Sequence, residues 1–180
     1  YSAKVLAHIP SLLKHFRKKI QVRLHFVTSV MDQEGYEVYT KKDWCTQFPD
    51  GRWVCSMHGE AETQENLRQV CAQELYPDKH RFIDYVVCRS DDPKSDDWEA
   101  CAKKVKMDAD DIEACVTGEQ GLDLLQADHD LGNTLNIHAS PTFLWNNTVV
   151  EKASYDAEGL KTVFCKHNPQ KACKKKIKSR

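Results

Sequence analysis

The residues with the clearest chemical potential in this chain are eight cysteines, which could form disulfides, hold a metal or carry out thiol exchange. They are even in number, widely spaced and never arranged as Cys-x-x-Cys, the spacing common in zinc sites and redox pairs. This pattern favours disulfides in an oxidising compartment over eight reduced cysteines buried as small apolar groups. We therefore expect no metal and no other cofactor. The eight are Cys45, Cys55, Cys71, Cys88, Cys101, Cys115, Cys165 and Cys173.

We expect at least three bridges, including Cys45–Cys55 and Cys165–Cys173. The first would close a loop of about ten residues and contribute roughly 2–3 kcal/mol. The four middle cysteines allow three pairings, among which we favour Cys71–Cys115 with Cys88–Cys101. Bridged Cα atoms should lie about 4.4–6.8 Å apart.

His58 is followed by Gly59 and Glu62, a run that could supply acid–base chemistry. No serine or cysteine stands at a recognisable nucleophile turn, so we predict no catalytic residue and expect His58 to cap a helix. Trp44, Phe48 and Trp53 could form an exposed patch for clients or a small core beneath a bridged loop.

Ser140-Pro141 precedes a predicted strand–turn–strand, a place that favours a cis peptide bond. The alternative interpretation is a rigid turn that shapes the edge of a sheet. Asn146-Asn147-Thr148 is a sequon for N-glycosylation of Asn146, which agrees with a secretory or extracellular location.

The 180 residues fit one domain, and the net charge of −1 with 41% hydrophobic residues does not favour a nucleic-acid partner. No apolar run has the length of a membrane span. Because the chain does not begin with methionine, we expect a processed or truncated product. The basic tail at 168–180 is interpreted as a solvated, frayed end rather than an arm for anionic partners.

Apolar spacing predicts an amphipathic helix over 2–19, which Pro10 kinks or begins, and a strand over 20–28. Residues 30–57 show no regular pattern apart from a turn at 49–51. Four or five short helices follow, with Ser95 and Asp108 as N-caps and Pro77 ending one of them. A helix over 119–132, a hairpin turning at Asn146-Asn147 and a helix over 155–165 complete the order.

The run from His58 to Cys71 resembles the His-Gly-x-x-Glu…Asn…Cys pattern of GILT-like thiol oxidoreductases, and the element order resembles DsbA-like proteins. Thr63 stands where the GILT pattern has a cysteine, and Cys55 lies one residue too far upstream. The resemblance implies an α/β thioredoxin-like (DsbA-type) fold with an inserted all-helical subdomain. It divides the chain into core residues 1–58, an insertion at 59–118, core residues 119–167 with the cis-Pro loop, and the tail.

In such proteins the redox cysteine precedes the first helix, and the residue before the cis-proline pairs with extended substrate. The resemblance therefore implies substrate contacts at Tyr1, Ser2, Ser140 and Pro141. If Cys-Pro preceded Tyr1, Ser2 would occupy the resolving position and the domain would be monothiol. We also expect a missing central strand, between 20–28 and 142–146, supplied by other residues or another polypeptide.

The sequence thus predicts a thioredoxin-fold domain related to secretory thiol–disulfide oxidoreductases, monothiol or inactive in this chain, with protein or peptide clients. The alternative is a non-catalytic binding or structural module of a larger disulfide-bonded protein. A third hypothesis is a secreted effector whose basic tail engages anionic surfaces.

Overall fold

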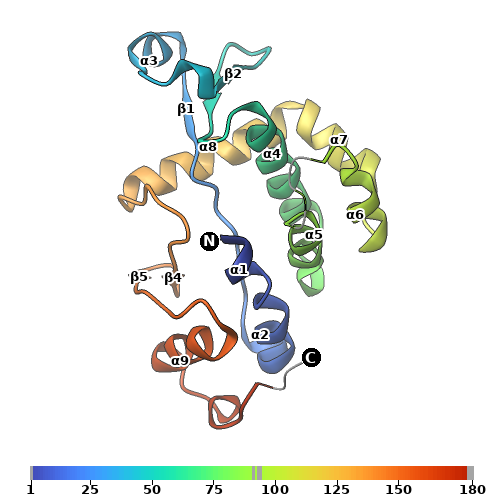
Figure 1. The fold of residues 1–180 in the computed structure, drawn as a ribbon, viewed down its shortest axis with the longest axis vertical. Helices are drawn as coiled ribbons and strands as arrows, with labels where there is room; N and C mark the ends of the chain where they lie inside the picture. Colours follow the sequence, from blue (N-terminus) through green and yellow to red (C-terminus); the bar gives the residue numbers. More distant parts are fainter. Residues whose placement is uncertain (1, 91, 93–94, 178–180) are drawn as a thin grey trace. The chain divides into compact units, whose positions relative to one another are not determined.

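A computed structural model describes residues 2–90, 92 and 95–177 of the chain. It divides into two compact units, shown as a ribbon in Figure 1. Unit 1 comprises residues 1–22 and 139–180, and unit 2 comprises residues 23–138. Among the described residues, no helix combines the length and apolar character needed to cross a membrane.

Unit 1 is built from two short N-terminal helices, a hairpin and a C-terminal helix. Its elements are α1 (Ser2–Leu6), α2 (Ile9–Phe16), the 3₁₀ turn η1 (Arg17–Lys19), β4 (Leu144–Trp145), β5 (Val149–Val150), α9 (Ala157–His167) and the 3₁₀ turn η4 (Lys171–Lys174). Phe16 of α2 packs on Phe164 of α9 with ring centroids 4.6 Å apart. Val5, Ile9, Leu12 and Leu160 complete this buried core.

The single helix predicted over 2–19 is two helices, and Pro10 lies in the first turn of α2. Proline is tolerated there because its missing N–H has no partner in a first turn. The hairpin turns through Asn146 and Asn147, both with positive φ, as the sequence predicts.

Unit 2 combines a small antiparallel sheet with a group of helices. The sheet consists of β1 (Ser29–Met31), β2 (Cys45–Gln47) and β3 (Trp53–Cys55) in the order β1-β3-β2. Between β1 and β2 lie α3 (Gln33–Val38) and the 3₁₀ turn η2 (Lys42–Trp44). The sequence missed this sheet, because its strands are only three residues long and too short for an alternating pattern.

The helices of unit 2 surround α4, which contacts α5, α7 and α8 as well as β2 and β3. Leu67, Val70 and Cys71 of α4 are buried there. The helices are α4 (Glu60–Leu75), α5 (Arg81–Arg89) after the 3₁₀ turn η3 (Asp78–His80), α6 (Trp98–Lys104), α7 (Ala109–Thr117) and α8 (Glu119–Thr134). Asp108 caps α7 as predicted, whereas α6 begins after Asp97 and not at Ser95, whose hydroxyl accepts a hydrogen bond from the Asp97 amide.

The eight cysteines form four disulfides, in the predicted pairs Cys45–Cys55, Cys71–Cys115, Cys88–Cys101 and Cys165–Cys173. Three have Cα atoms 5.8–5.9 Å apart, within the predicted range. In Cys45–Cys55 the separation is 4.0 Å, shorter than predicted. These two residues face each other across β2 and β3, and the flanking pairs carry the backbone hydrogen bonds. Cα atoms approach most closely at such non-hydrogen-bonded positions.

Candidate functional site

The strand predicted over 20–28 is absent, because helix side chains rather than a neighbouring strand bind this backbone. The Gln73 amide accepts from the Leu24 N–H at 2.7 Å and donates to the Leu24 carbonyl at 2.9 Å. Asp128 accepts from the Phe26 N–H at 2.9 Å and contacts the His25 ring at 2.6 Å.

The opposite edge of this segment has no such partners. Exposure alternates along 23–27, as in an extended chain, with the odd-numbered residues outward. The backbone groups of Arg23, His25 and Val27 make no hydrogen bond to any described residue. The segment is therefore strand-like, with one edge bound to α4 and α8 and the other open.

The His58–Glu62 run forms the beginning of α4. Gly59 is the N-cap with φ of 79°, a conformation that favours glycine. Glu62 accepts from the His58 backbone N–H at 3.0 Å and contacts its ring at 3.1 Å. His58 is exposed and does not cap the helix with its side chain, because the N-cap lies one residue later. These contacts give the run a structural role.

Ser56 and Thr63 lie within the same motif and form a buried pair. The Thr63 hydroxyl donates to the Ser56 hydroxyl at 3.1 Å, and each residue is at most 1% exposed. Thr63 occupies the position of a cysteine in the GILT pattern. At this position the chain therefore has a buried hydrogen bond between two hydroxyls and no thiol. Cys71, at the end of the motif, is fully buried in its bridge to Cys115.

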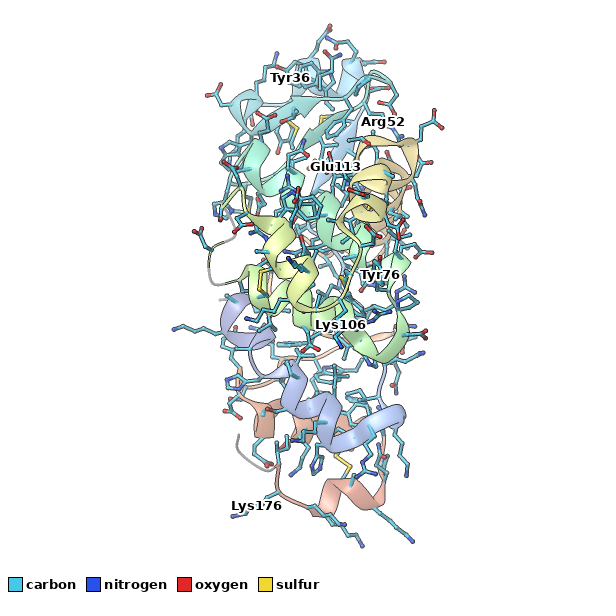
Figure 2. All side chains as sticks on the ribbon, turned by 90° about the vertical axis from the view of Figure 1, so that its right-hand side faces the viewer. Tyr36, Arg52, Tyr76, Lys106, Glu113 and Lys176 are labelled. Carbon is cyan, nitrogen blue, oxygen red and sulfur yellow. A yellow bond between two sulfur atoms is a disulfide. The ribbon has the colours of Figure 1, made fainter. Side chains whose placement is uncertain are left out.

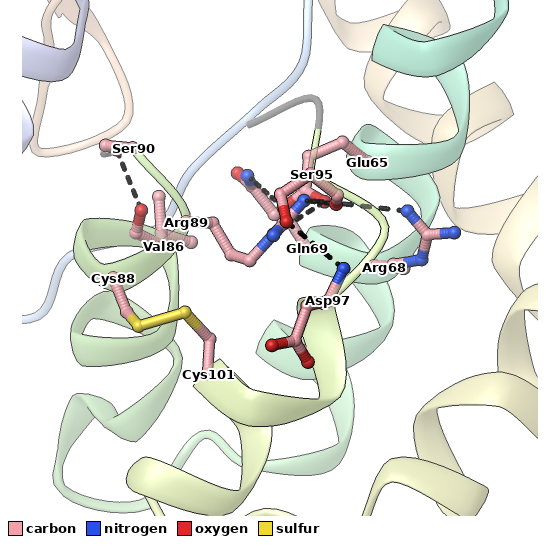
Figure 3. A network of polar contacts seen from close by, with 10 residues as sticks. All are labelled: Glu65, Arg68, Gln69, Val86, Cys88, Arg89, Ser90, Ser95, Asp97 and Cys101. Atoms are coloured by element: carbon pink, nitrogen blue, oxygen red, sulfur yellow. Dashed lines mark hydrogen bonds and ion pairs between the residues drawn. A yellow bond between two sulfur atoms is a disulfide. The ribbon is translucent and has the colours of Figure 1, made fainter. Parts of the chain in front are cut away.

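Glu65 is the centre of a buried ionic network, which Figure 3 shows at close range. Its carboxylate lies 3.0 Å from the Arg89 guanidinium and 3.7 Å from that of Arg68. Gln69 donates to the other carboxylate oxygen at 2.9 Å, and Arg89 also donates to the Ser95 carbonyl at 2.9 Å. The network links α4, α5 and the chain before α6.

Tyr85 is fully buried in the same unit, and its hydroxyl has no hydrogen-bond partner. Burial raises the pKa of Tyr85 well above its usual range, and the nearby Glu65 carboxylate adds to this effect. A phenol that stays protonated and enclosed does not act as a base, so this region is part of the core.

Two tryptophans of the Cys45–Cys55 region pack against neighbouring side chains. Trp53 stacks on Tyr36 with ring centroids 3.6 Å apart, and its indole N–H donates to Gln33 at 3.0 Å. Lys41 lies over the ring of Trp44 at 3.9 Å. These half-buried contacts favour the small-core interpretation over an exposed patch.

The loop before β4 differs from these regions because the backbone groups of Ser140 lack hydrogen-bond partners among the described residues. The Ser140–Pro141 peptide bond is cis, and Ser140 is exposed. Neither backbone group of Ser140 makes a hydrogen bond to the described part of the chain. Thr142 steadies the loop by donating from its hydroxyl to the Ala139 carbonyl at 2.5 Å.

Aromatic side chains that the sequence analysis did not single out lie beside this loop. Phe143 stacks with Trp145 at 5.9 Å and contacts Tyr155 at 6.5 Å between ring centroids. Phe143 lies just before β4 and Trp145 within it, two residues apart, a spacing that puts side chains of an extended chain on the same side and could have been recognised in the sequence. Their half-buried rings extend the loop surface with apolar area.

Asn146, the asparagine of the sequon, is exposed at the tip of the hairpin, where its side-chain oxygen accepts from Asn168 at 3.0 Å.

Two substrate contacts were predicted at the beginning of the chain. Ser2 is the first residue of α1, and Tyr1 lies outside the described residues. Across the described ranges, no group of three or more histidine, cysteine or acidic side chains is placed to hold a metal ion.

Comparison with known families matches residues 11–105 to the sequence model described as gamma interferon inducible lysosomal thiol reductase (GILT). The match begins within α2 and includes the whole sheet of unit 2 and the helices from α3 to α6. Searches of curated proteins and of solved structures gave no match.

Proposed function

Because the chain belongs to the GILT family of thiol reductases, we propose that it is a redox-inactive, thioredoxin-like domain that holds extended protein or peptide clients. In this proposal the fold is of the DsbA type, with the core at 1–58 and 119–167 and the helical insertion at 59–118. Clients contact Ser140 and Pro141, and Tyr1 and Ser2 border the same site. The compartment is secretory or extracellular.

The observation that carries the proposal is the state of the cysteines. Thiol–disulfide exchange begins with attack by a thiolate, so an enzyme needs an accessible cysteine of low pKa. All eight cysteines of this chain are paired in disulfides. Cys55, Cys71, Cys101 and Cys115 are at most 9% exposed, which hinders attack on those bridges. The chain therefore offers no thiol of its own for catalysis.

Client binding is supported by the unoccupied backbone of Ser140. An extended peptide can add to such a position through main-chain hydrogen bonds, while neighbouring pockets or rings select its side chains. Phe143 and Trp145 supply aromatic surface beside the loop. This chemistry favours extended segments with apolar side chains.

The second candidate function, a structural module of a larger disulfide-bonded protein, is favoured by the open edge at 23–27. Its outward backbone groups could pair with a strand from a partner polypeptide that completes the sheet. Hydrogen–deuterium exchange distinguishes the two functions. A client at the loop protects residue 140, whereas a completing strand protects residues 23, 25 and 27.

The proposal is tested with the purified chain and a reduced, alkylated insulin B chain as the probe. Calorimetry should detect binding, and the chain should not accelerate insulin reduction by dithiothreitol. Ser140→Pro removes the backbone N–H and should weaken binding at least about tenfold, whereas the control Ser140→Ala retains that N–H and the affinity. Far-UV circular dichroism checks that both variants fold. Catalytic reduction of insulin, or equal binding by both variants, contradicts the proposal.

A further inference from the structure

The small net charge of the chain hides a large separation of charge between its two units. Unit 1 contains fourteen lysine and arginine residues but three acidic ones, a formal net charge of +11. Unit 2 contains twelve basic and twenty-four acidic residues, a formal net charge of −12. Net charge of this size dominates long-range association with charged partners.

The three acidic residues of unit 1 are all engaged in internal contacts. Glu151 contacts Lys166 and His167, each at 2.7 Å. Glu158 contacts Lys161 at 2.6 Å and accepts from the Ile177 N–H at 2.7 Å. Asp156 accepts from Ser154 and from the Gly159 N–H. Glu151 and Glu158 are thus paired with basic residues outside the two runs described next, and Asp156 forms no ion pair with a described residue.

Two basic runs far apart in the sequence meet in this unit. The first covers the last turn of α2 and the 3₁₀ turn η1, and the second lies in and after η4. His15 contacts the Ala172 carbonyl at 2.9 Å, and the Cys165–Cys173 disulfide fixes η4 to α9. Together the runs form a basic cluster of exposed residues, namely Lys14, Arg17, Lys19, Lys171, Lys174, Lys175 and Lys176.

This cluster is ordered and uncompensated, unlike the frayed tail predicted from the sequence. The Lys161 ammonium donates to the Lys175 carbonyl at 2.8 Å, which anchors the chain after η4. Within the described residues, no acidic side chain lies within ion-pair distance of the cluster. Figure 2 shows Lys176 extending away from the ribbon. Residues 178–180 of the predicted tail lie outside the described part.

We propose that the basic cluster binds a linear sulfated polysaccharide. Dense cationic patches bind polyanions by releasing condensed counterions, and basic runs of this length are typical of heparin-binding patches. The four disulfides fit a secreted or extracellular protein, and sulfated polysaccharides are polyanions of that environment. The proposal is independent of client binding at Ser140.

Other polyanions fit the cluster less well. Stable binding to a membrane surface needs apolar side chains that insert among the lipids. Val150 and Tyr155 are the large exposed apolar residues of unit 1 in its described part, and neither belongs to the cluster. Single-stranded nucleic acid is held by stacking on exposed aromatic rings, whereas Phe16, within the first run, is buried.

The test measures binding of the full chain to immobilised heparin as a function of salt. The triple variant Lys174→Gln, Lys175→Gln, Lys176→Gln should weaken binding roughly 100-fold at low salt. The slope of log affinity against log salt should fall by about three. These side chains are exposed and form no ion pair with a described residue, so the unfolding temperature should not change.

The matched control is Lys103→Gln, Lys104→Gln, Lys152→Gln, which removes the same charge from exposed positions outside the cluster. It should change heparin affinity less than about threefold, as long-range effects are screened by salt. An equal loss in both triple variants overturns the proposal. So does competition by duplex DNA or by phosphatidylserine vesicles as strong as that by soluble heparin.

Discussion

The two segments that carry the family resemblance use their polar groups in different ways. In the segment from Cys55 to Cys71, the polar side chains bind one another or other residues of unit 2. They are the carboxylates of Glu62 and Glu65, the hydroxyls of Ser56 and Thr63, and the sulfur of Cys71, which is in a disulfide. In the loop around Ser140, the two backbone groups of Ser140 itself form no hydrogen bond with a described residue, and the residue is exposed. Polar residues of a motif that bind one another stabilise the fold, whereas backbone groups without hydrogen-bond partners are available to bind another molecule.

Of the substitutions considered, the removal of Arg89 should lower the free energy of unfolding the most. Arg89→Ala leaves the buried Glu65 carboxylate with the Gln69 amide and, as its one remaining cation, the more distant Arg68. It should lower the free energy of unfolding by about 3–5 kcal/mol. The control Arg23→Ala removes an exposed ion pair with Glu74 and should cost below about 1 kcal/mol. Urea denaturation with intact disulfides measures both, and similar values would contradict a stabilising network.

The disulfides of the two units should differ in their contribution to stability. Replacing Cys71 and Cys115 by alanine opens a span of 44 residues and should cost about 4 kcal/mol. The same change at Cys165 and Cys173 opens a span of 8 residues and should cost about 2.5 kcal/mol. Denaturation curves of both double variants test this order, and the reverse order would show that loop entropy does not determine it.

The hydroxyl pair in the first segment should contribute less. Thr63→Val leaves the buried Ser56 hydroxyl without a partner and should cost about 1–3 kcal/mol. Thr63→Ser retains the donor and provides a comparison at the same site. Thr117→Val, at an exposed hydroxyl that donates to a helix carbonyl, should stay within about 0.5 kcal/mol. Thermal unfolding of the three variants would show whether burial sets the effect.

Acid should weaken unit 1 through the N-cap of α9. Hydrogen bonds from the Gly159 amide and the Ser154 hydroxyl hold the pKa of Asp156 below its usual value. Its stabilising contribution is therefore complete above the usual carboxyl pKa and is lost as pH falls through the lowered one. Asp156→Asn, still a good N-cap, should reduce this dependence of the unfolding temperature between pH 6 and 2. An unchanged pH profile would exclude Asp156 as the titrating group.

Modification of the hairpin should have the smallest effect on the fold. Thr148→Ala destroys the sequon while leaving Asn146 in its turn. The secreted variant should therefore lack the mass of an N-linked glycan that a glycosidase removes from the wild-type protein, with little change in stability. Thr148→Ser preserves the sequon and the modification. A wild-type chain secreted without that mass would show that Asn146 is not used.

Short-range patterns were sufficient for several features of the molecule. Pro10 in a first turn, Asp108 at an N-cap and the Asn146-Asn147 turn follow from backbone preferences that each residue carries in any context. Even number and spacing predicted that the cysteines form disulfides, whereas the pairing of the middle four was one of three possibilities and the structure decided it. The close approach of Cys45 and Cys55 depends on the register of β2 and β3, which cannot be predicted from strands of only three residues.

The sequence by itself determined which residues favour helices, turns and bridges, and that no Cys-x-x-Cys pair exists, because these properties are local. Tertiary structure decided that Gln73 and Asp128 bind the backbone of 24–26 where a strand was expected. It also decided that Glu65 is buried with Arg89, and that Lys14 and Lys171 belong to one basic cluster. Each of these depends on contacts between segments that only the packed chain brings together, since the free energy of an ionic or polar group is set by its neighbours in space.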